Sequence, residues 1–305
     1  MDMRALLGKM LIFVTLMVLG YLAARTGKVS PAFAKGASWL TINVFMTGTI
    51  INSAITNAPE LTPKETANVI FVLFVTLIIM YLLATLAGRV LRQNRQYEGL
   101  SVALMAVVNN MFIGLPVVQQ IAPGAALYVS LSCLPYNLLL YTYGVWRMKA
   151  GDGKFTFNAK ELFSVPLLAT LAAFVIFLFK IPVPPLGREL MTSLSNATMP
   201  LSMLVVGTSL GTIRLGDAFR GWQTYAIAFV RLLLCPVLVW LVIRNLTDNA
   251  LLITASTVVA ASPSGIIVTA RALNYDKDAV YTSKCILVNT AISMATIPLI
   301  VFLLL

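Results

Sequence analysis

The chain has 305 residues, of which 59% are hydrophobic and only 11% charged, whereas soluble domains are about 25% charged. It contains no histidine, and none of its 11 acidic residues lies inside an apolar run. This composition excludes a soluble fold and argues against an enzyme, because proton transfer and zinc chemistry need His, Cys or acidic side chains gathered in a pocket. We therefore expect no catalytic residues, no metal site and no cofactor.

The net charge of +11 has two possible explanations, nucleic-acid binding or membrane-protein loops. The basic residues occur in short clusters between apolar runs, and they form no continuous basic stretch. This pattern favours loops beside a lipid bilayer, and we expect no nucleic-acid partner. The three cysteines stand singly in apolar segments and are interpreted as packing residues rather than disulfides or ligands.

The apolar runs, taken in chain order, predict ten membrane-spanning helices, because a span needs about 20 mainly apolar residues. The charge-free run 99–146 is too long for one helix, and Pro123 with Gly124 divides it into two. The predicted spans lie near 5–24, 35–56, 67–89, 99–121, 126–147, 162–180, 190–211, 222–244, 250–271 and 282–304.

The loop charges predict how the chain lies in the membrane. If the N-terminus is outside, the loops on the inner side carry most of the Lys and Arg residues, as the positive-inside rule requires. We therefore expect both termini on the outer, periplasmic side of a bacterial cytoplasmic (inner) membrane.

The spacing of the first five predicted spans recurs in the last five. Because five is an odd number, a second set of five must enter the membrane from the opposite side, which makes an inverted repeat typical of secondary transporters. The predicted fold is an all-α polytopic membrane protein. It consists of a first five-helix repeat at 1–147, a polar cytoplasmic linker at 148–161 and a second, inverted repeat at 162–305.

The fourth and ninth predicted spans, which correspond in the two repeats, are both interrupted by helix-breaking residues. Proline removes a backbone donor and glycine permits unwound backbone, so these helices are expected to break and cross near the midplane and to bind substrate there. The alternative is that each proline merely kinks its helix. The candidate substrate-binding residues are Asn109, Asn110, Gly114, Pro116, Ser262, Pro263, Ser264 and Gly265.

Arg231 is the one charged residue deep inside a predicted span, and such residues are expensive in the membrane. It either draws a carboxylate into the site, since guanidinium binds carboxylate in a fork, or braces helix-end carbonyls. Asn43, Asn137 and Asn289 are expected mainly to join helices. The small residues Gly207 and Gly211 predict close helix packing inside the fold, with a dimer seam as the alternative.

Several motifs together resemble the auxin efflux carrier family, which includes bacterial malonate and other organic-acid transporters. Asn109 precedes Gly114-Leu115-Pro116 in the fourth span, as in the family's fourth helix. The other matching segments are Leu19-Gly20-Tyr21, Pro200-Leu201-Ser202-Met203-Leu204 with Gly207 and Leu210-Gly211, Arg231-Leu232 with Pro236, and Ser262-Pro263-Ser264-Gly265 with Ala270. One departure is Met46-Thr47-Gly48, which stands where the family usually has a proline in the second helix.

This resemblance implies a homodimeric carrier with a fold similar to bile-acid and sodium/proton transporters. Substrate would bind where the fourth and ninth helices cross, and an elevator-like movement would carry small organic anions, mono- or dicarboxylates such as malonate or malate. Coupling to sodium, coupling to protons and uniport remain open. The alternative functions are a sodium-coupled symporter of a larger amphipathic anion and a membrane anion receptor that does not transport.

Overall fold

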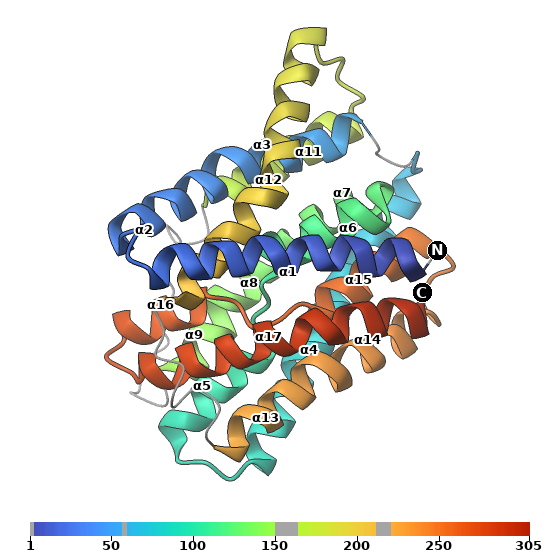
Figure 1. Ribbon diagram of the computed structural model, residues 1–305. Helices are drawn as coiled ribbons and strands as arrows, with labels where there is room; N and C mark the ends of the chain where they lie inside the picture. The colour runs from blue at the N-terminus through green and yellow to red at the C-terminus, as the bar shows by residue number, and fades with distance from the viewer. Residues whose placement is uncertain (1–2, 57–59, 150–163, 212–220) are drawn as a thin grey trace.

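The computed structural model describes residues 3–56, 60–149, 164–211 and 221–305, and all regular elements in these ranges are helical (Figure 1). The elements of the first half are α1 (Met3–Arg25), α2 (Pro31–Leu40), η1 (Thr41–Phe45), α3 (Met46–Ile55), α4 (Pro63–Val90), α5 (Arg95–Ala106), η2 (Asn110–Gly114), α6 (Leu115–Ile121), η3 (Pro123–Ala125), α7 (Ala126–Leu131), α8 (Cys133–Leu139), η4 (Leu140–Gly144) and α9 (Val145–Met148). Those of the second half are α11 (Val165–Leu178), α12 (Pro185–Gly211), α13 (Trp222–Phe229), η6 (Val230–Leu234), α14 (Cys235–Ile243), α15 (Ala250–Ala261), α16 (Ile267–Asn274) and α17 (Ala279–Leu304).

Each predicted span contains helical structure. Among the described residues, five helical runs are long and apolar enough to cross a membrane, and three apolar helices are shorter: Leu11–Arg25, Val165–Leu178 and Ala250–Ala261. The five long runs are Lys64–Val90, Pro123–Met148, Pro185–Gly211, Trp222–Ile243 and Ala279–Leu304. The all-helical membrane fold is thus confirmed. Its division into two inverted repeats stays a prediction, and most of the predicted linker lies outside the described residues.

Large apolar side chains cover the outside of the long helices. Leu11 on α1 is 66% exposed, Leu186 on α12 is 79% exposed, and Phe302 on α17 is 59% exposed. Apolar surface of this extent is unfavourable in water but suits the hydrocarbon core of a bilayer. The exposed apolar side chains therefore agree with the membrane protein that the hydrophobic composition predicted.

Polar residues at the helix starts set where several spans begin. The Thr62 and Glu65 side chains form a capping box at the start of α4, with Pro63 in the first turn. The side chains of Ser30, Asn249 and Asp278 accept backbone N–H groups at the starts of α2, α15 and α17. These caps satisfy amides that would otherwise lack partners at the helix ends.

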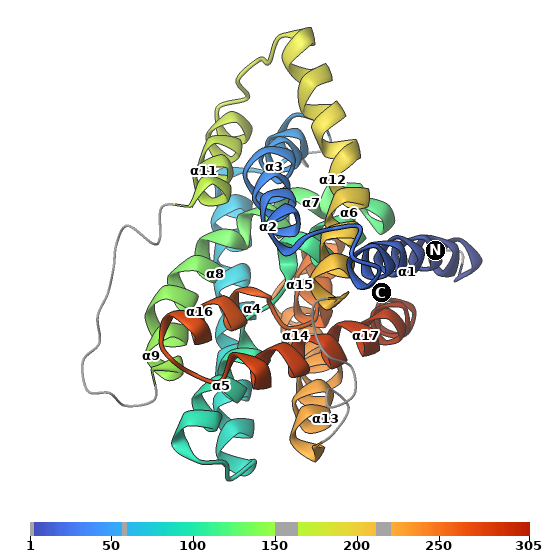
Figure 2. The same cartoon turned by 60° about the vertical axis from the view of Figure 1, so that its left-hand side comes forward.

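The helices pack into two groups. The first helix group comprises α1, α2, η1, α3, α11 and α12, with α12 packed against both α1 and α3. The second helix group comprises α4 to α9 and α13 to α17, in which α4 packs on α5 and α14, and α13 on α17. Figures 1 and 2 show α2, α3, α11 and α12 at one side of the molecule and α4, α5 and α13 at the other, while α1 and α17 run side by side between them.

The tight contact between α1 and α12 depends on glycine. A Cβ atom added at Gly207 would lie 2.0 Å from the Met17 carbonyl oxygen, and one at Gly20 would lie 2.3 Å from the Leu204 carbonyl oxygen. At Gly211 the added atom would lie 2.7 Å from the Ala24 Cβ. The two helices approach this closely only because these positions lack side chains. The predicted close packing of Gly207 and Gly211 inside the fold is therefore confirmed.

The second span contains a π-helical turn rather than a proline. The π-helical turn η1 ends at Phe45, immediately before Met46-Thr47-Gly48. A π-helical turn interrupts the regular hydrogen-bond ladder and is one of the recognised causes of a helix kink. The helix can therefore bend here although Met46-Thr47-Gly48 contains no proline.

Candidate functional site

The predicted interruptions in the fourth and ninth spans are present, and their backbones pair with each other. The Asn109 N–H donates to the Pro263 carbonyl at 2.8 Å, and the Gly265 N–H donates to the Val107 carbonyl at 2.9 Å. Val108 and Ser264 form an isolated antiparallel bridge between them. Unwound backbone inside a membrane is viable only where its polar groups find partners, and here each interruption supplies them to the other.

Side chains from neighbouring helices hold this crossing in place. The Ser264 hydroxyl donates to the Leu104 carbonyl at 2.6 Å, and the Asn289 amide donates to the Ser264 oxygen at 2.6 Å. The Ser262 hydroxyl donates to the Val258 carbonyl at 2.9 Å within its own helix. Asn289 thus joins α17 to the crossing, in agreement with its prediction as an interhelical contact, whereas Ser262 and Ser264 are occupied by structural bonds.

Glycine and proline at the crossing serve close packing. A Cβ atom on Gly265 would lie 2.9 Å from the Val108 carbonyl oxygen, and one on Gly114 would lie 2.8 Å from the Ser262 hydroxyl oxygen. Pro116 is buried at the second position of α6, directly after the π-helical turn η2. Gly114 and Pro116 therefore shape the crossing without lining the cavity beside it.

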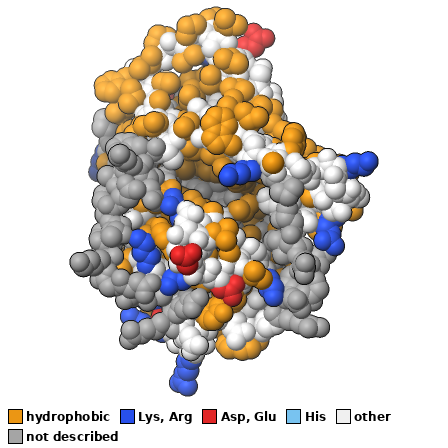
Figure 3. All heavy atoms as spheres, turned by 90° about the vertical axis from the view of Figure 1, so that its left-hand side faces the viewer, with side chains coloured by type: hydrophobic (Ala, Val, Ile, Leu, Met, Phe, Trp, Pro, Cys, Tyr) orange, Lys and Arg blue, Asp and Glu red, His pale blue; other side chains and the backbone are white. Residues whose placement is uncertain are grey.

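A cavity of about 380 Å³ lies beside the crossing, between the two helix groups. From the second group it is lined by Asn109, Asn110, Tyr136, Asn137, Tyr141 and Gly265, and from the first group by Ser38, Asn43, Pro166 and Ser209. No described residue that lines it is charged. Figure 3, which views the end opposite the chain termini, shows that this face is hollowed below the apolar upper part of the molecule, with Lys and Arg side chains nearby.

Two asparagines that line this cavity differ in their side-chain hydrogen bonds. Asn109 is only 5% exposed, and its side-chain nitrogen has no hydrogen-bond partner among the described residues. Asn110 donates its side-chain N–H to the Ser132 hydroxyl at 3.3 Å. A buried donor without a partner costs about 1–3 kcal/mol, so the Asn109 amide is the group at this site that most needs a ligand.

The broken helices also direct their N-terminal ends towards the cavity. Ile266 and Ile267 at the start of α16 line it, as do Met111 and Phe112 in η2, which continues into α6. The first amides of a helix have no intrahelical partners, and the helix dipole makes this end favourable for negative charge. The cavity is therefore suited to an anion although no charged side chain lines it.

Arg231 lies outside the cavity lining. It is completely buried in the π-helical turn η6, and its Nη2 donates to the Val259 carbonyl of α15 at 3.3 Å. Its Nε and Nη1 atoms are without hydrogen-bond partners in the described part of the chain. Arg231 thus braces a helix carbonyl, as one prediction had it.

The sequence interpretation missed the tyrosines of the cavity. Tyr136 and Tyr141 line it, and the guanidinium of Arg271 lies 5.1 Å from the centre of the Tyr141 ring. The available signal was the four-residue spacing of Cys133, Asn137 and Tyr141, which puts the three side chains on one helix face. All three line the cavity.

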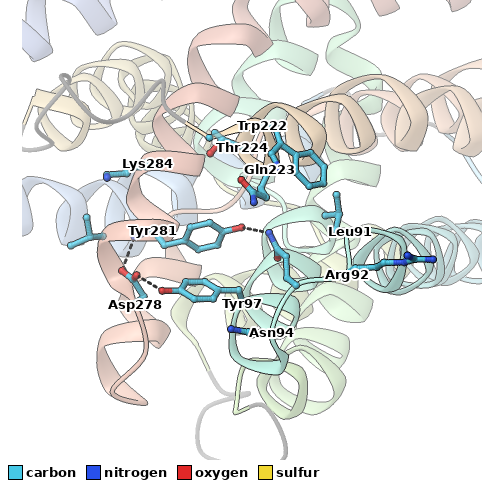
Figure 4. A pocket seen from close by; sticks show the side chains of 13 residues that line it. Leu91, Arg92, Asn94, Tyr97, Trp222, Gln223, Thr224, Asp278, Tyr281 and Lys284 are labelled. Atoms are coloured by element: carbon cyan, nitrogen blue, oxygen red, sulfur yellow. Dashed lines mark hydrogen bonds between the residues drawn. The ribbon is translucent and has the colours of Figure 1, made fainter.

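A second cavity, of about 520 Å³, lies where the α4–α5 loop meets the starts of α13 and α17 (Figure 4). Its walls are tied by the Gln93 amide, which donates to the Tyr281 hydroxyl at 3.3 Å, and by the Tyr97 hydroxyl, which donates to Asp278 at 3.1 Å. Lys284, predicted to reach the membrane interface, lines this cavity. Arg92 is a second basic residue of this lining, and Figure 4 shows its side chain extending away from Tyr281.

An all-helical membrane fold in which two broken helices cross beside a cavity is the architecture of a secondary transporter. A family model described as membrane transport protein matches residues 5–301. The chain belongs to this family, that of the auxin efflux carriers, as the sequence motifs predicted.

One relative is a protein of Methanothermobacter thermautotrophicus described as an uncharacterized transporter, which is 26% identical over 204 residues. The match covers 66% of this chain and 66% of that protein, slightly less than two thirds of its length. The family and this relative are both named for transport rather than for catalysis.

Proposed function

We propose that the protein carries small organic anions, mono- or dicarboxylates of the malonate or malate type, across the bacterial cytoplasmic membrane. The observation that carries this proposal concerns Asn109, which lines the cavity at the crossing. This residue is only 5% exposed, and its side-chain nitrogen has no hydrogen-bond partner among the described residues. An amide N–H donates to a carboxylate oxygen, and a charge-assisted bond of this kind is stronger than a neutral one.

Two further features favour an anion over a neutral or cationic substrate. The N-terminal end of α16 meets the cavity, and its first amides and dipole favour negative charge. The buried Arg231 has no acidic partner among the described residues, so no ion pair there compensates its charge. A carboxylate bound at Asn109 would reduce the cost of this buried cation.

The size of the cavity favours a small substrate. At about 380 Å³ it lies at the lower end of the range of small-molecule pockets, about 300–1,000 Å³. This volume suits a short carboxylate better than a large amphipathic anion such as a bile acid. A sodium-coupled carrier of the latter type is therefore the second candidate, and an anion receptor that does not transport is the third.

The position of the cavity supports an elevator-type movement. Its lining comes from both helix groups, and the crossing itself belongs entirely to the second group. Movement of the second helix group against the first would carry the crossing and its substrate together, so that the site itself would face first one side of the membrane and then the other. We also propose that the chain forms two inverted five-helix repeats, that it assembles as a homodimer, and that both termini face outward.

Counterflow in proteoliposomes tests this function. Vesicles loaded with unlabelled malonate or malate should accumulate the labelled acid from outside, and Asn109→Ala should weaken apparent affinity by about tenfold, the loss of one charge-assisted bond. Asn245→Ala is the matched control, because Asn245 is exposed and bonds only the Leu241 carbonyl of its own helix. Binding of these acids without any exchange would favour the receptor, and neither binding nor exchange would refute the assigned substrate class.

A further inference from the structure

The two helix groups are joined by polar contacts at the end of the molecule opposite the open cavity. The cavity is lined by α2, η4, the start of α11 and α16, whereas α6 and α7 lie towards the end where the N- and C-termini meet (Figures 1 and 2). At this end the second group contacts α1, α3, α11 and α12 of the first group.

The Lys9 side chain of α1 makes one of these contacts, because its ammonium group donates to the carbonyl oxygen of Gln120 in α6. This carbonyl belongs to the last turn of a short helix, where carbonyls lack intrahelical partners and the helix dipole is negative. A cation is favoured at that position. Lys9 therefore both satisfies a helix end and binds the second helix group to the first.

The neighbouring residue makes a contact of the same kind with another helix. The Gln119 amide of α6 donates to the Ser195 hydroxyl of α12 at 3.0 Å. Close by, Ser130 of α7 lies 3.5 Å from the Ser53 hydroxyl of α3, and its carbonyl accepts from Thr170 of α11 at 3.4 Å. We call the two α6 contacts, Lys9–Gln120 and Gln119–Ser195, the latch.

The latch is connected to the substrate cavity through one short stretch of helix. η2 and α6 form a continuous helical segment over residues 110–121, and its first residues, Asn110, Met111 and Phe112, line the cavity. Its last turn carries both latch positions, Gln119 and Gln120. A shift of this segment at one end therefore requires a shift at the other.

We propose that the latch holds the protein in the state with the cavity open at the end opposite the termini. In this state the last turn of α6 is fixed to α1 and α12. The start of the same helical segment, in η2, lines the accessible cavity. Both latch contacts join the two helix groups, so they must break when the second group moves to expose the site at the opposite end. The proposal rests on the proposed function for the existence of that movement, and it assigns Lys9, Gln119 and Ser195 as residues that set its equilibrium.

Thiol labelling in detergent tests the latch without any substrate. Ser38→Cys is the reporter, because Ser38 is partly buried and lines the open cavity; it is introduced together with Cys133→Ala, since Cys133 lines the same cavity, and the other two native cysteines are buried. Lys9→Met and Gln119→Leu, each combined with the reporter, should slow its modification by a water-soluble methanethiosulfonate about threefold, because loss of contacts specific to one state lowers its population. Lys9→Arg should restore the rate, and Lys64→Met, which removes an exposed lysine on α4, should leave it unchanged.

A cross-link provides the opposite test and does not depend on how well the latch variants fold. Gln119→Cys with Ser195→Cys, joined by a short cleavable bifunctional thiol reagent, should abolish counterflow while a thermal shift with malonate persists, and cleavage should restore exchange. Full exchange by the cross-linked protein, or an unchanged labelling rate in both Lys9→Met and Gln119→Leu, would overturn the latch. Absence of exchange in the wild type with slowed labelling in the variants would instead refute the proposed transport and leave the latch supported.

Discussion

Asn109 and Pro263, which come from different halves of the chain, are joined by a backbone hydrogen bond of 2.8 Å at the centre of the crossing. The bond uses the main-chain N–H of Asn109 and leaves its side-chain amide without a partner in the described structure. One residue therefore fixes the unwound backbone, lines the cavity and keeps a buried side-chain donor without a partner in the described structure. Structural and ligand-binding roles at this position are carried by different atoms.

We expect Gly265→Ala to impair transport strongly. The added Cβ would lie 2.9 Å from the Val108 carbonyl oxygen and 3.2 Å from Val107, so the two interruptions would have to separate and weaken their hydrogen bonds. Overpacking of this kind costs about 1–3 kcal/mol, and here it acts directly on the site. Exchange of labelled malonate measures the loss.

Gly36→Ala is the matched control for this substitution, because nothing lies within 4 Å of the position that its Cβ would occupy. It should transport as the wild type does. If Gly265→Ala also retained wild-type exchange and affinity, close approach of the two backbones would not be required for transport.

Much of this architecture could be predicted from the sequence, because membranes impose simple constraints. Uninterrupted apolar runs predict spans, and the Pro and Gly residues near 114–116 and 263–265 predict breaks, since few other residues tolerate unwound backbone. The cavity could not be predicted to the same extent. Its tyrosines belong to an apolar span. In such a span the sequence alone does not distinguish an aromatic residue that faces lipid from one that faces the protein core or a substrate.

The role of Arg231 also could not be predicted from the sequence alone. Its presence inside a span indicated an unusual environment, but the choice between ligand and brace depends on where η6 directs the side chain. The structure places it against the Val259 carbonyl, and it is not among the residues that line the cavity. Side-chain direction in three dimensions is not encoded by hydropathy.

Arg231→Met should raise thermal stability while weakening anion binding. The arginine is fully buried with two nitrogen atoms unpartnered in the described residues, and replacing such a charge with an apolar side chain of similar volume is often stabilising by about 1–4 kcal/mol. Loss of its charge should at the same time lower malonate affinity by about tenfold or less, since it does not itself line the cavity. Thermal unfolding with and without malonate separates the two effects.

The opposite outcome for Arg231→Met would identify the arginine as a structural brace alone. In that case the melting temperature of the unliganded protein would fall, while malonate affinity in the folded fraction would stay at the wild-type value. Arg231→Lys serves as the comparison, because it keeps the charge and loses the planar donor geometry.

Pro263→Ala should reduce transport more than expression. Proline at this position cannot donate to the Val259 carbonyl one turn earlier, and this keeps α15 from continuing through the crossing. Alanine restores that donor and favours a longer helix, which would withdraw the Pro263 carbonyl position from the Asn109 N–H. Pro116→Ala should act in the same direction, and normal transport by both variants would place the site elsewhere.

Gly207→Ala should destabilise the protein without directly altering the cavity. Its Cβ would lie 2.0 Å from the Met17 carbonyl oxygen, so α1 and α12 would have to separate, at a cost of about 1–3 kcal/mol or more. Gly8→Ala on α1, which has nothing within 4 Å, should leave the unfolding temperature unchanged. A Gly207→Ala protein that unfolds at the wild-type temperature would show that the helices can move apart without penalty.

A proton gradient alone should not drive accumulation of the substrate. The sequence has no histidine, and none of its acidic residues lies inside an apolar run, so the groups that usually carry protons within membrane carriers are missing from its spans. A sodium ion could instead be held by Asn oxygens and the carbonyls of unwound backbone, and a uniporter needs neither. Proteoliposomes with separately imposed pH, sodium and voltage gradients distinguish these cases. Accumulation that depends strictly on the pH gradient, with sodium and voltage held constant, would show that a group other than an intramembrane carboxylate or imidazole carries the proton.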